Sequence, residues 1–262
     1  MVLERFRLDG RIAIVSGAGR GIGAAAAIAL AEAGADLVIG ARSAEQLDET
    51  VGVIEGQGRR AMAIAGDLSS REGMQSMVDA AVDGFGRIDV VVNNVGGAMP
   101  SAFLDTSEAS FDAALSFNVT TAFNLTQLAV PHLLESDGAS IINIASSAGQ
   151  FAFRGMSAYG TAKAALIHLT RELAQDLSPR IRVNAISPGA IATSALDIVL
   201  QTPELHDAML DGTPLRRLGD PDDISAAVLY LASSASSYVT GEVLGVNGGI
   251  QGPNLDLGLP DL

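Results

Sequence analysis

Tyr159 and Lys163 are the side chains whose types and spacing most clearly suggest chemistry. A phenol and an ammonium four residues apart lie on one face of a helix, which we expect to run to about Leu177. An ammonium beside a phenol favours the phenolate and lowers the phenol's pKa from about 10, so the pair can handle a proton. The spacing also suits an ordinary surface pair. However, Lys163 is the only lysine among 16 lysine and arginine residues, which suggests that a compact point charge is needed there.

A glycine-rich segment, residues 16–23, follows the first expected strand and opens an alanine-rich helix. Backbone N–H groups of such a turn, together with a helix N-terminus, can accept a pyrophosphate. The segment therefore predicts a dinucleotide site, although glycine-rich loops also serve as plain turns. The candidate cofactor residues here are Gly17, Arg20, Gly21, Ile22 and Gly23.

Arg42 ends the second expected strand, about 20 residues beyond the glycine loop. An NAD-selective fold places an acidic residue there, against the ribose 2'-hydroxyl. A guanidinium instead suits a 2'-phosphate, and Arg20 could approach from the other side. We therefore expect a preference for NADP(H), with NAD(H) possible. The alternative is that Arg42 is only a solvated strand end.

Short apolar segments that alternate with helical patterns are expected to form the scaffold. The seven expected strands are 12–15, 37–39, 61–65, 88–92, 140–145, 182–186 and 243–246. Their nearly continuous apolar character is typical of strands covered on both faces. This predicts an α/β fold of one domain, residues 1–262, with a Rossmann-type doubly wound sheet of seven parallel strands. The uncharged stretch 113–134 carries several polar residues, so we interpret it as a long buried helix rather than a membrane span.

Composition excludes several classes of protein. The net charge of −14 and the lack of any basic cluster oppose binding to nucleic acid. There is no cysteine, and the 3 histidines lack metal-ligand spacing, so no metal site is expected. The amino terminus lacks the apolar core of a secretory signal, so we expect a cytoplasmic protein without membrane attachment.

These motifs together resemble the short-chain dehydrogenase/reductase family, in its compact single-domain branch. The resemblance covers nearly everything from Leu8 to Gly249, and residues 93–96 (Asn-Asn-Val-Gly) match the family's NNAG motif except at Val95. The stretch 213–219 is similar to bacterial 7α-hydroxysteroid dehydrogenases and to related 3-oxoacyl reductases. The family's catalytic tetrad corresponds to Asn118, Ser146, Tyr159 and Lys163.

The resemblance implies a role for each tetrad residue. Tyr159 exchanges a proton with the substrate oxygen while hydride moves at the nicotinamide, as in other enzymes that act on CH–OH groups. Lys163 favours the phenolate and holds the nicotinamide ribose. Ser146 hydrogen-bonds the substrate oxygen and is preferred to Ser147 because of its spacing to Tyr159, while Asn118 holds a water that links Lys163 to solvent.

The resemblance also implies further cofactor contacts. Asp67 corresponds to the residue that hydrogen-bonds adenine, although it could instead cap the next helix. The segment 188–193 corresponds to the part of the family beside the nicotinamide carboxamide. The additional candidate contacts are Leu68, Asn94, Gly96, Pro188, Gly189, Ile191 and Thr193.

Residues 97–100, 150–156 and a lid at about 193–214 are expected to line the substrate site. Their apolar side chains, Phe151, Phe153, Met156, Ile191, Leu196 and Met209, suggest a bulky hydroxysteroid-like or alicyclic ketone or alcohol, or else ordinary packing.

Two alternative functions remain. A 3-oxoacyl thioester reductase would need basic surface for its acidic carrier, for which Arg154 offers little; a dinucleotide sensor would not need the tetrad. The resemblance further implies a homotetramer, and residues 250–262 are expected to form an irregular tail.

Overall fold

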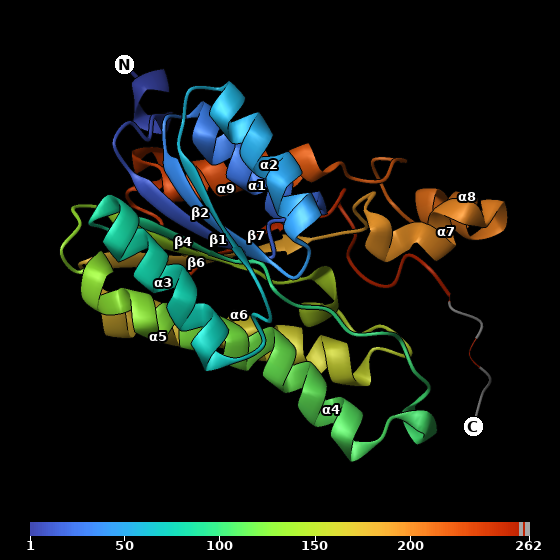
Figure 1. The fold of residues 1–262 in the computed structure, drawn as a ribbon. Coiled ribbons are helices and arrows are strands. Elements are labelled where there is room, and N and C mark those ends of the chain that lie inside the picture. The colour runs from blue at the N-terminus through green and yellow to red at the C-terminus, as the bar shows by residue number, and fades with distance from the viewer. Residues whose placement is uncertain (257–258, 260–262) are drawn as a thin grey trace.

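The computed structural model describes residues 1–256 and Leu259, and its core is one parallel sheet. Within these residues seven strands run in the order β3-β2-β1-β4-β5-β6-β7 (Figure 1), and every neighbouring pair is parallel. This confirms the predicted fold class. The strands are β1 (Ile12–Ser16), β2 (Asp36–Ala41), β3 (Ala61–Ala65), β4 (Val90–Asn93), β5 (Ala139–Ile144), β6 (Ile181–Pro188) and β7 (Val243–Val246).

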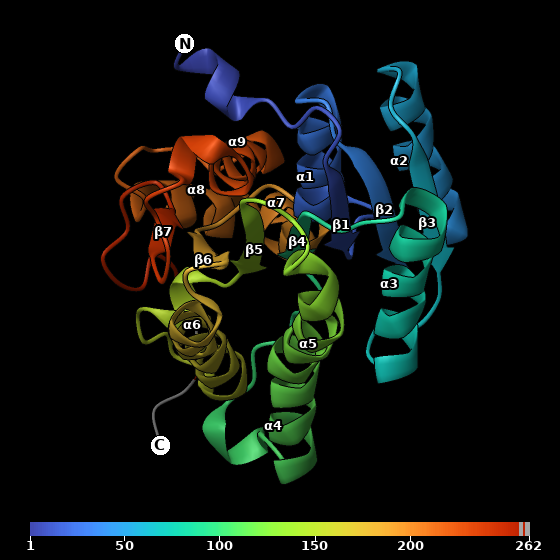
Figure 2. The ribbon, with the colours of Figure 1, turned by 90° about the vertical axis from the view of Figure 1, so that its left-hand side faces the viewer.

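Helices cover both faces of the sheet, as Figures 1 and 2 show. One face carries α1 (Gly21–Glu32), α2 (Ala44–Gly56) and α9 (Pro221–Ala232). The other carries α3 (Arg71–Phe85), α5 (Thr121–Leu133) and α6 (Ser157–Leu177). The helix α4 (Glu108–Leu115) leads into α5, while α7 (Asp197–Gln201) and α8 (Pro203–Asp211) lie together at one end of the molecule.

The two hydrophobic cores explain why the strands are apolar almost without interruption. Alternate side chains of a strand point to opposite faces of the sheet. In β5, for example, Ile142 and Ile144 belong to the core under α1 and α9, whereas Ile141 belongs to the core under α3, α5 and α6. Both faces are therefore dry, and a strand with a polar face would leave one core unfilled.

Several predicted boundaries were wrong by one or two residues. The strand expected at 88–92 is β4, Val90–Asn93. It begins after Asp89, whose side chain accepts a hydrogen bond from the Ile12 N–H at the edge of the sheet. The strand expected at 140–145 is shifted by one residue, and the sixth strand continues to Pro188.

The stretch 113–134 is helical but is not one long buried helix. It contains the end of α4, a π-helical turn (Ser116–Thr120) and α5. Only one side of it faces the sheet, and Phe123 on the other side is 40% exposed. The uncharged stretch 113–134 is therefore helical, as predicted. The prediction that it is buried all round was wrong, because a helix that packs on a sheet buries one face only.

The expected lid and the expected tail differ in secondary structure. Residues 193–214 contain a short 3-10 turn (Ser194–Leu196), α7 and α8. Residues 250–256 have no helix or strand, and Asn254 donates from Nδ2 to Oγ1 of Thr213 at 3.1 Å. The remainder of the expected tail, 257–258 and 260–262, lies outside the described residues, and the roles of lid and tail stay predictions.

Asp89 joins three elements at the amino-terminal edge of the sheet. Its carboxylate accepts hydrogen bonds from the Ile12 N–H (2.9 Å), the Arg11 guanidinium (2.8 Å) and the Ser136 hydroxyl. Arg87 adds two more, at 2.9 and 2.7 Å. Burial alone would raise the pKa of Asp89, but these donors together lower it. The carboxylate is 1% exposed and is therefore a structural anion.

We expect Asp89→Ala to destabilise the fold by about 2–3 kcal/mol, because the substitution leaves a buried N–H and a buried hydroxyl unpaired. Asp9→Ala is the matched control, since Asp9 pairs with Arg7 at the surface and such pairs contribute about 0–1 kcal/mol. Urea unfolding at pH 7 measures both. Equal losses in the two variants would contradict the structural role of Asp89.

Candidate active site

Tyr159 and Lys163 lie in the first two turns of α6, on the same face. The Lys163 side chain is buried, and its Nζ donates to the carbonyl oxygen of Ile144 at 2.8 Å. The same Nζ lies 5.8 Å from the centroid of the Tyr159 ring. The carboxyl end of β5 and the start of α6 thus hold the ammonium and the phenol together.

Burial changes the proton affinity of both groups. It lowers the pKa of Lys163 to about 8, because the ammonium loses its hydration and has one carbonyl partner. Burial also raises the pKa of Tyr159, and the hydrogen bond with Ser146 offsets this only in part. The lowering of the phenol's pKa that was expected from Lys163 is therefore not found; burial raises this pKa, and the opposing effect is the hydrogen bond with Ser146.

Ser146 is the serine that reaches the phenol. It follows the end of β5 directly, and its hydroxyl hydrogen-bonds Tyr159 and accepts from the Ala148 N–H at 3.2 Å. Ser147 begins a 3-10 turn (Ser147–Gly149) and is buried. Two hydroxyl groups, those of Ser146 and Tyr159, therefore lie where a substrate oxygen could contact both.

Asn118 lies in the π-helical turn and is fully buried. Its Oδ1 accepts from the Gly97 N–H at 2.8 Å, and its Nδ2 donates to the carbonyls of Gly97 (3.0 Å) and Ala114 (2.9 Å). A Cβ added at Gly96 would lie 2.6 Å from Oδ1 of Asn118 and 2.9 Å from Nζ of Lys163. Asn118 and Lys163 therefore border one small space that only a glycine at position 96 leaves open.

The glycine loop has the close backbone approaches expected of a phosphate site. Gly17 has a φ of +71°, and a Cβ there would lie 2.8 Å from Nδ2 of Asn94, which donates to the Gly17 carbonyl at 3.0 Å. A Cβ at Gly23 would overlap the Gly17 carbonyl oxygen. The hydroxyl of Ser16 accepts from the N–H of Asn94 at 3.1 Å. The start of α1 has no side-chain cap, so its N–H groups fit a pyrophosphate.

Arg42 and Asp67, both predicted to lie at the adenosine side, are close enough to interact, and both are exposed. Hydrogen bonds from the Ser69 backbone N–H and hydroxyl, and then the charge of Arg42, lower the pKa of Asp67. Ser70, rather than Asp67, caps α3 by accepting from the Gly73 N–H at 3.0 Å. The helix-cap alternative for Asp67 is therefore wrong. Leu68 is buried beside it, and Arg20 is exposed at the N-cap of α1.

The segment after β6 lies against the glycine loop. A Cβ at Gly21, whose φ is +56°, would lie 3.1 Å from Cγ2 of Thr193. A Cβ at Gly189 would lie 2.8 Å from Cα of Asn247, so Gly189, which follows Pro188, permits close backbone packing. Ile191 is buried and forms a β-bridge with residue 219. These contacts place the predicted nicotinamide segment opposite the predicted pyrophosphate loop.

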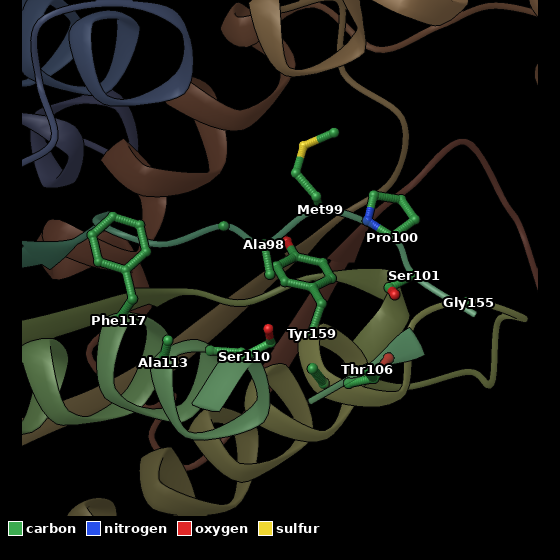
Figure 3. A pocket seen from close by; sticks show the side chains of 13 residues that line it. Ala98, Met99, Pro100, Ser101, Thr106, Ser110, Ala113, Phe117, Gly155 and Tyr159 are labelled. Atoms are coloured by element: carbon green, nitrogen blue, oxygen red, sulfur yellow. The ribbon is translucent and has the colours of Figure 1, made fainter. Parts of the chain in front are cut away.

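A cavity of about 580 Å³ lies between α4, the start of α6 and the loop after β4. Figure 3 shows the Tyr159 ring among its lining side chains, with Ala98 and Met99 above the ring. The loop is held to the opposite wall by the Ser101 N–H, which donates to the Gly155 carbonyl at 2.9 Å. The lining residues are Gly97, Ala98, Met99, Pro100, Ser101, Thr106, Ser110, Ala113, Ala114, Phe117, Gly155, Ala158 and Tyr159.

The α4 wall of this cavity was missed by the sequence reasoning. Ser110, Ala113, Ala114 and Phe117 recur at helical spacing, which was the available signal. The apolar side chains expected to line the substrate site, at 151, 153, 156, 191, 196 and 209, are not among the residues that line this cavity. Arg154 and α8 instead border a second cavity of about 430 Å³.

The described part of the chain contains neither a cluster of metal-binding side chains nor a membrane-spanning helix. Residues 1–256 and Leu259 contain no group of three or more histidine or acidic side chains arranged to hold a metal ion. None of the helices in these residues has the length and apolar character needed to cross a membrane.

Comparison with known proteins identifies the family. The model of a family described as enoyl-(acyl carrier protein) reductase matches residues 17–251. An uncharacterized oxidoreductase of Mycobacterium tuberculosis is 54% identical over 263 residues, which cover 100% of both chains. The 7α-hydroxysteroid dehydrogenase of Escherichia coli strain K12 is 42% identical over 247 residues, 94% of this chain and 96% of that protein.

A solved structure agrees with these matches. The 7α-hydroxysteroid dehydrogenase complexed with NADH and 7-oxo glycochenodeoxycholic acid has a TM-score of 0.91 and 42% identity, covering 95% of this chain and 98% of the other. The sheet order, the two helical layers and the glycine loop described above therefore have a close counterpart. The chain belongs to the short-chain dehydrogenase/reductase family of oxidoreductases, which act on CH–OH groups with a nicotinamide dinucleotide.

Proposed function

We propose that this chain interconverts a ketone and a secondary alcohol on a bulky apolar substrate, with NADP(H) as the hydride carrier. The observation that carries the proposal is the position of Tyr159 in the wall of the cavity. The phenol is hydrogen-bonded by Ser146, and the side chains that line the cavity among the described residues are all uncharged. An uncharged cavity with one proton-transferring group suits a large neutral ring system.

The chain's own residues supply the proton and the binding interactions. The dinucleotide, when bound, supplies or accepts the hydride. Tyr159 holds a proton at its phenol oxygen, and its raised pKa keeps that proton in place at neutral pH, as ketone reduction requires. Ser146 donates to the developing charge on the substrate oxygen, and Lys163, beside Asn118, would contact the nicotinamide ribose.

The relatives support a hydroxysteroid-like substrate over a thioester. The Escherichia coli relative is a 7α-hydroxysteroid dehydrogenase, and the similar solved structure of a 7α-hydroxysteroid dehydrogenase contains 7-oxo glycochenodeoxycholic acid. The description of the matching family names an acyl carrier protein, which keeps a 3-oxoacyl thioester as the second candidate. With a net charge of −14, this chain would repel an acidic carrier.

We expect Tyr159→Phe to lower kcat about 1,000-fold or more, while the affinity for NADPH changes less than about twofold, because only the transferable proton is lost. A screen of bulky ketones, including a 7-oxo bile acid and a 3-oxoacyl thioester, followed by NADPH absorbance measures the rates. Tyr238→Phe is the matched control, since Tyr238 is fully exposed. Turnover that survives in Tyr159→Phe would exclude Tyr159 as the acid.

The preference for NADP(H) rests on Arg42. It follows β2, its charge reaches Asp67, and no carboxylate ends β2. The similar 7α-hydroxysteroid dehydrogenase structure contains NADH, so the two cofactors have to be compared directly on this chain.

We expect kcat/KM for NADPH to exceed that for NADH by about 10- to 100-fold, the value of a charged hydrogen bond to a phosphate. Arg42→Asp should reverse the preference, because a carboxylate repels the 2'-phosphate and accepts from a 2'-hydroxyl. Arg42→Lys, the control, keeps the positive charge, so kcat/KM for NADPH should stay higher than that for NADH. Faster turnover with NADH in the unaltered protein would overturn the assignment.

We expect Lys163→Met to be inactive and yet more stable at pH 7 by about 1–2 kcal/mol. Lowering the pKa from 10.5 to about 8 corresponds to a cost of about 3 kcal/mol, and loss of the hydrogen bond to Ile144 offsets part of the gain. Between pH 8 and 10.5 the unfolded chain binds more protons, so the stability of the unaltered protein rises with pH there. Urea unfolding at pH 7 and pH 10 should therefore show a shrinking difference. A difference that does not change with pH would contradict the lowered pKa.

A homotetramer, a lid at 193–214 and a cytoplasmic location complete the proposal. Exposed apolar side chains support an assembly: Phe103 is 70% exposed, Leu104 is 74% exposed, and Phe123 lies on the outer side of α5. Phe103 and Leu104 are adjacent, and contiguous exposed apolar surface marks sites of protein–protein contact.

A further inference from the structure

Four buried polar side chains form a network behind the site, between the ends of β4 and β5 and the helices α5 and α6. Asn93 donates from Nδ2 to Oδ1 of Asn143 at 2.8 Å and to Oγ1 of Thr126 at 3.1 Å. Asn143 donates from Nδ2 to Oγ1 of Thr170 at 2.8 Å. Each of the four side chains is at most 3% exposed. None of them belongs to the tetrad or to the predicted cofactor contacts.

The network attaches α6 to β5 at a second point. The first is the hydrogen bond from Lys163 to the Ile144 carbonyl, and the second joins Thr170 to Asn143. The two strand residues are neighbours, about 3.3 Å apart along β5, whereas the two helix residues are two turns apart, about 10 Å along α6. The Thr170 hydroxyl donates to the Leu166 carbonyl at 2.8 Å, so it is oriented to accept from Asn143.

Two attachments constrain the helix more than one does. A single hydrogen bond at Lys163 allows α6 to rotate about that contact, and the apolar contacts of the helix have no preferred direction. A second hydrogen bond two turns away removes this freedom. Sliding or rotating α6 would leave the Asn143 amide and the Thr170 hydroxyl unpaired in a dry interior, which is unfavourable.

The same network reaches the other two parts of the site. Asn93 precedes Asn94, whose side chain holds the carbonyl of Gly17 in the glycine loop. Thr126 lies two turns after Asn118 in the continuous helical segment that contains the π-helical turn. The network thus joins α6, which carries Lys163, to the helical segment that contains Asn118 and to the strand that precedes Asn94.

We propose that Asn143 and Thr170 are positioning residues of the oxidoreductase reaction, which hold α6 at the height on β5 where Lys163 reaches the carbonyl of Ile144. The register that they set also places Tyr159, one turn before Lys163, at the wall of the cavity. This inference rests on the proposed roles of Tyr159 and Lys163.

The test uses the full-length protein and the fact that Lys163 is its only lysine. Protein labelled with [ε-¹³C]lysine gives a single lysine signal, so an NMR pH titration reports on Lys163 without any assay of turnover. Thr170→Val removes the hydroxyl at constant shape, Thr170→Ser restores it, and Thr170→Ala is the second variant should valine disturb folding. Ser140→Ala is the matched control, because Ser140 makes a buried hydrogen bond to the Leu231 carbonyl at the opposite end of β5.

With the network broken, Lys163 should gain access to water, so its titration midpoint in Thr170→Val should rise from about 8 by at least half a pH unit. The value of kcat, measured with NADPH and the best ketone of the screen, should fall about tenfold with KM nearly unchanged, and its pH profile should shift by the same amount. Thr170→Ser should return both readouts to those of the unaltered protein.

The proposal is overturned if Thr170→Val loses as much stability as Ser140→Ala in urea and keeps the midpoint, kcat and pH profile of the unaltered protein. That result differs from failure of the proposed function. If Tyr159 were not the acid, Tyr159→Phe would stay active, whereas the NMR midpoint in Thr170→Val would still move.

Discussion

The buried ammonium of Lys163 is the constraint on which the rest of the site depends. A charge in a dry interior is unfavourable unless it is hydrogen-bonded, and here the Ile144 carbonyl is the partner that the structure places at 2.8 Å. Little space is left around this ammonium. A Cβ at Gly96 would lie 2.9 Å from Nζ, and one at Gly149 would lie 2.7 Å from the backbone of Lys163. Burial of the Lys163 ammonium is therefore unfavourable by itself, and it requires glycine in the two backbone segments that pack against it, at positions 96 and 149.

The parallel sheet makes this arrangement possible. All strands point the same way, so their carboxyl ends lie along one edge, and the polar residues of the site follow β1, β4, β5 and β6 at that edge. The strand order reverses between β1 and β4, which is where doubly wound sheets bind their ligands. Ser16 at the end of β1 accepts from the backbone of Asn94 after β4, so the two sides of this switch point are joined directly.

The substrate side is built differently from the cofactor side. The glycine loop and the NNAG-like motif leave little room for side chains, because a Cβ added at Gly17, Gly23 or Gly96 would lie less than 3 Å from neighbouring atoms. The cavity beside Tyr159 is instead lined by small and apolar side chains from α4 and from the loop after β4. A family can keep the glycine loop and Tyr159 while changing the other side chains of the cavity, because these determine which substrate fits rather than the hydride transfer.

The sequence by itself determined the fold class, the phosphate loop and the face of α6 that carries Tyr159 and Lys163, because these follow from local periodicity and spacing. Only the tertiary structure determines burial and the contacts between residues that are far apart in the sequence. The pKa of the Tyr159 phenol is raised rather than lowered, because burial outweighs the hydrogen bond with Ser146. Ser70 rather than Asp67 caps α3. The α4 wall and the Asn143–Thr170 contact join residues far apart in sequence, so only the packed sheet and its helices bring them together.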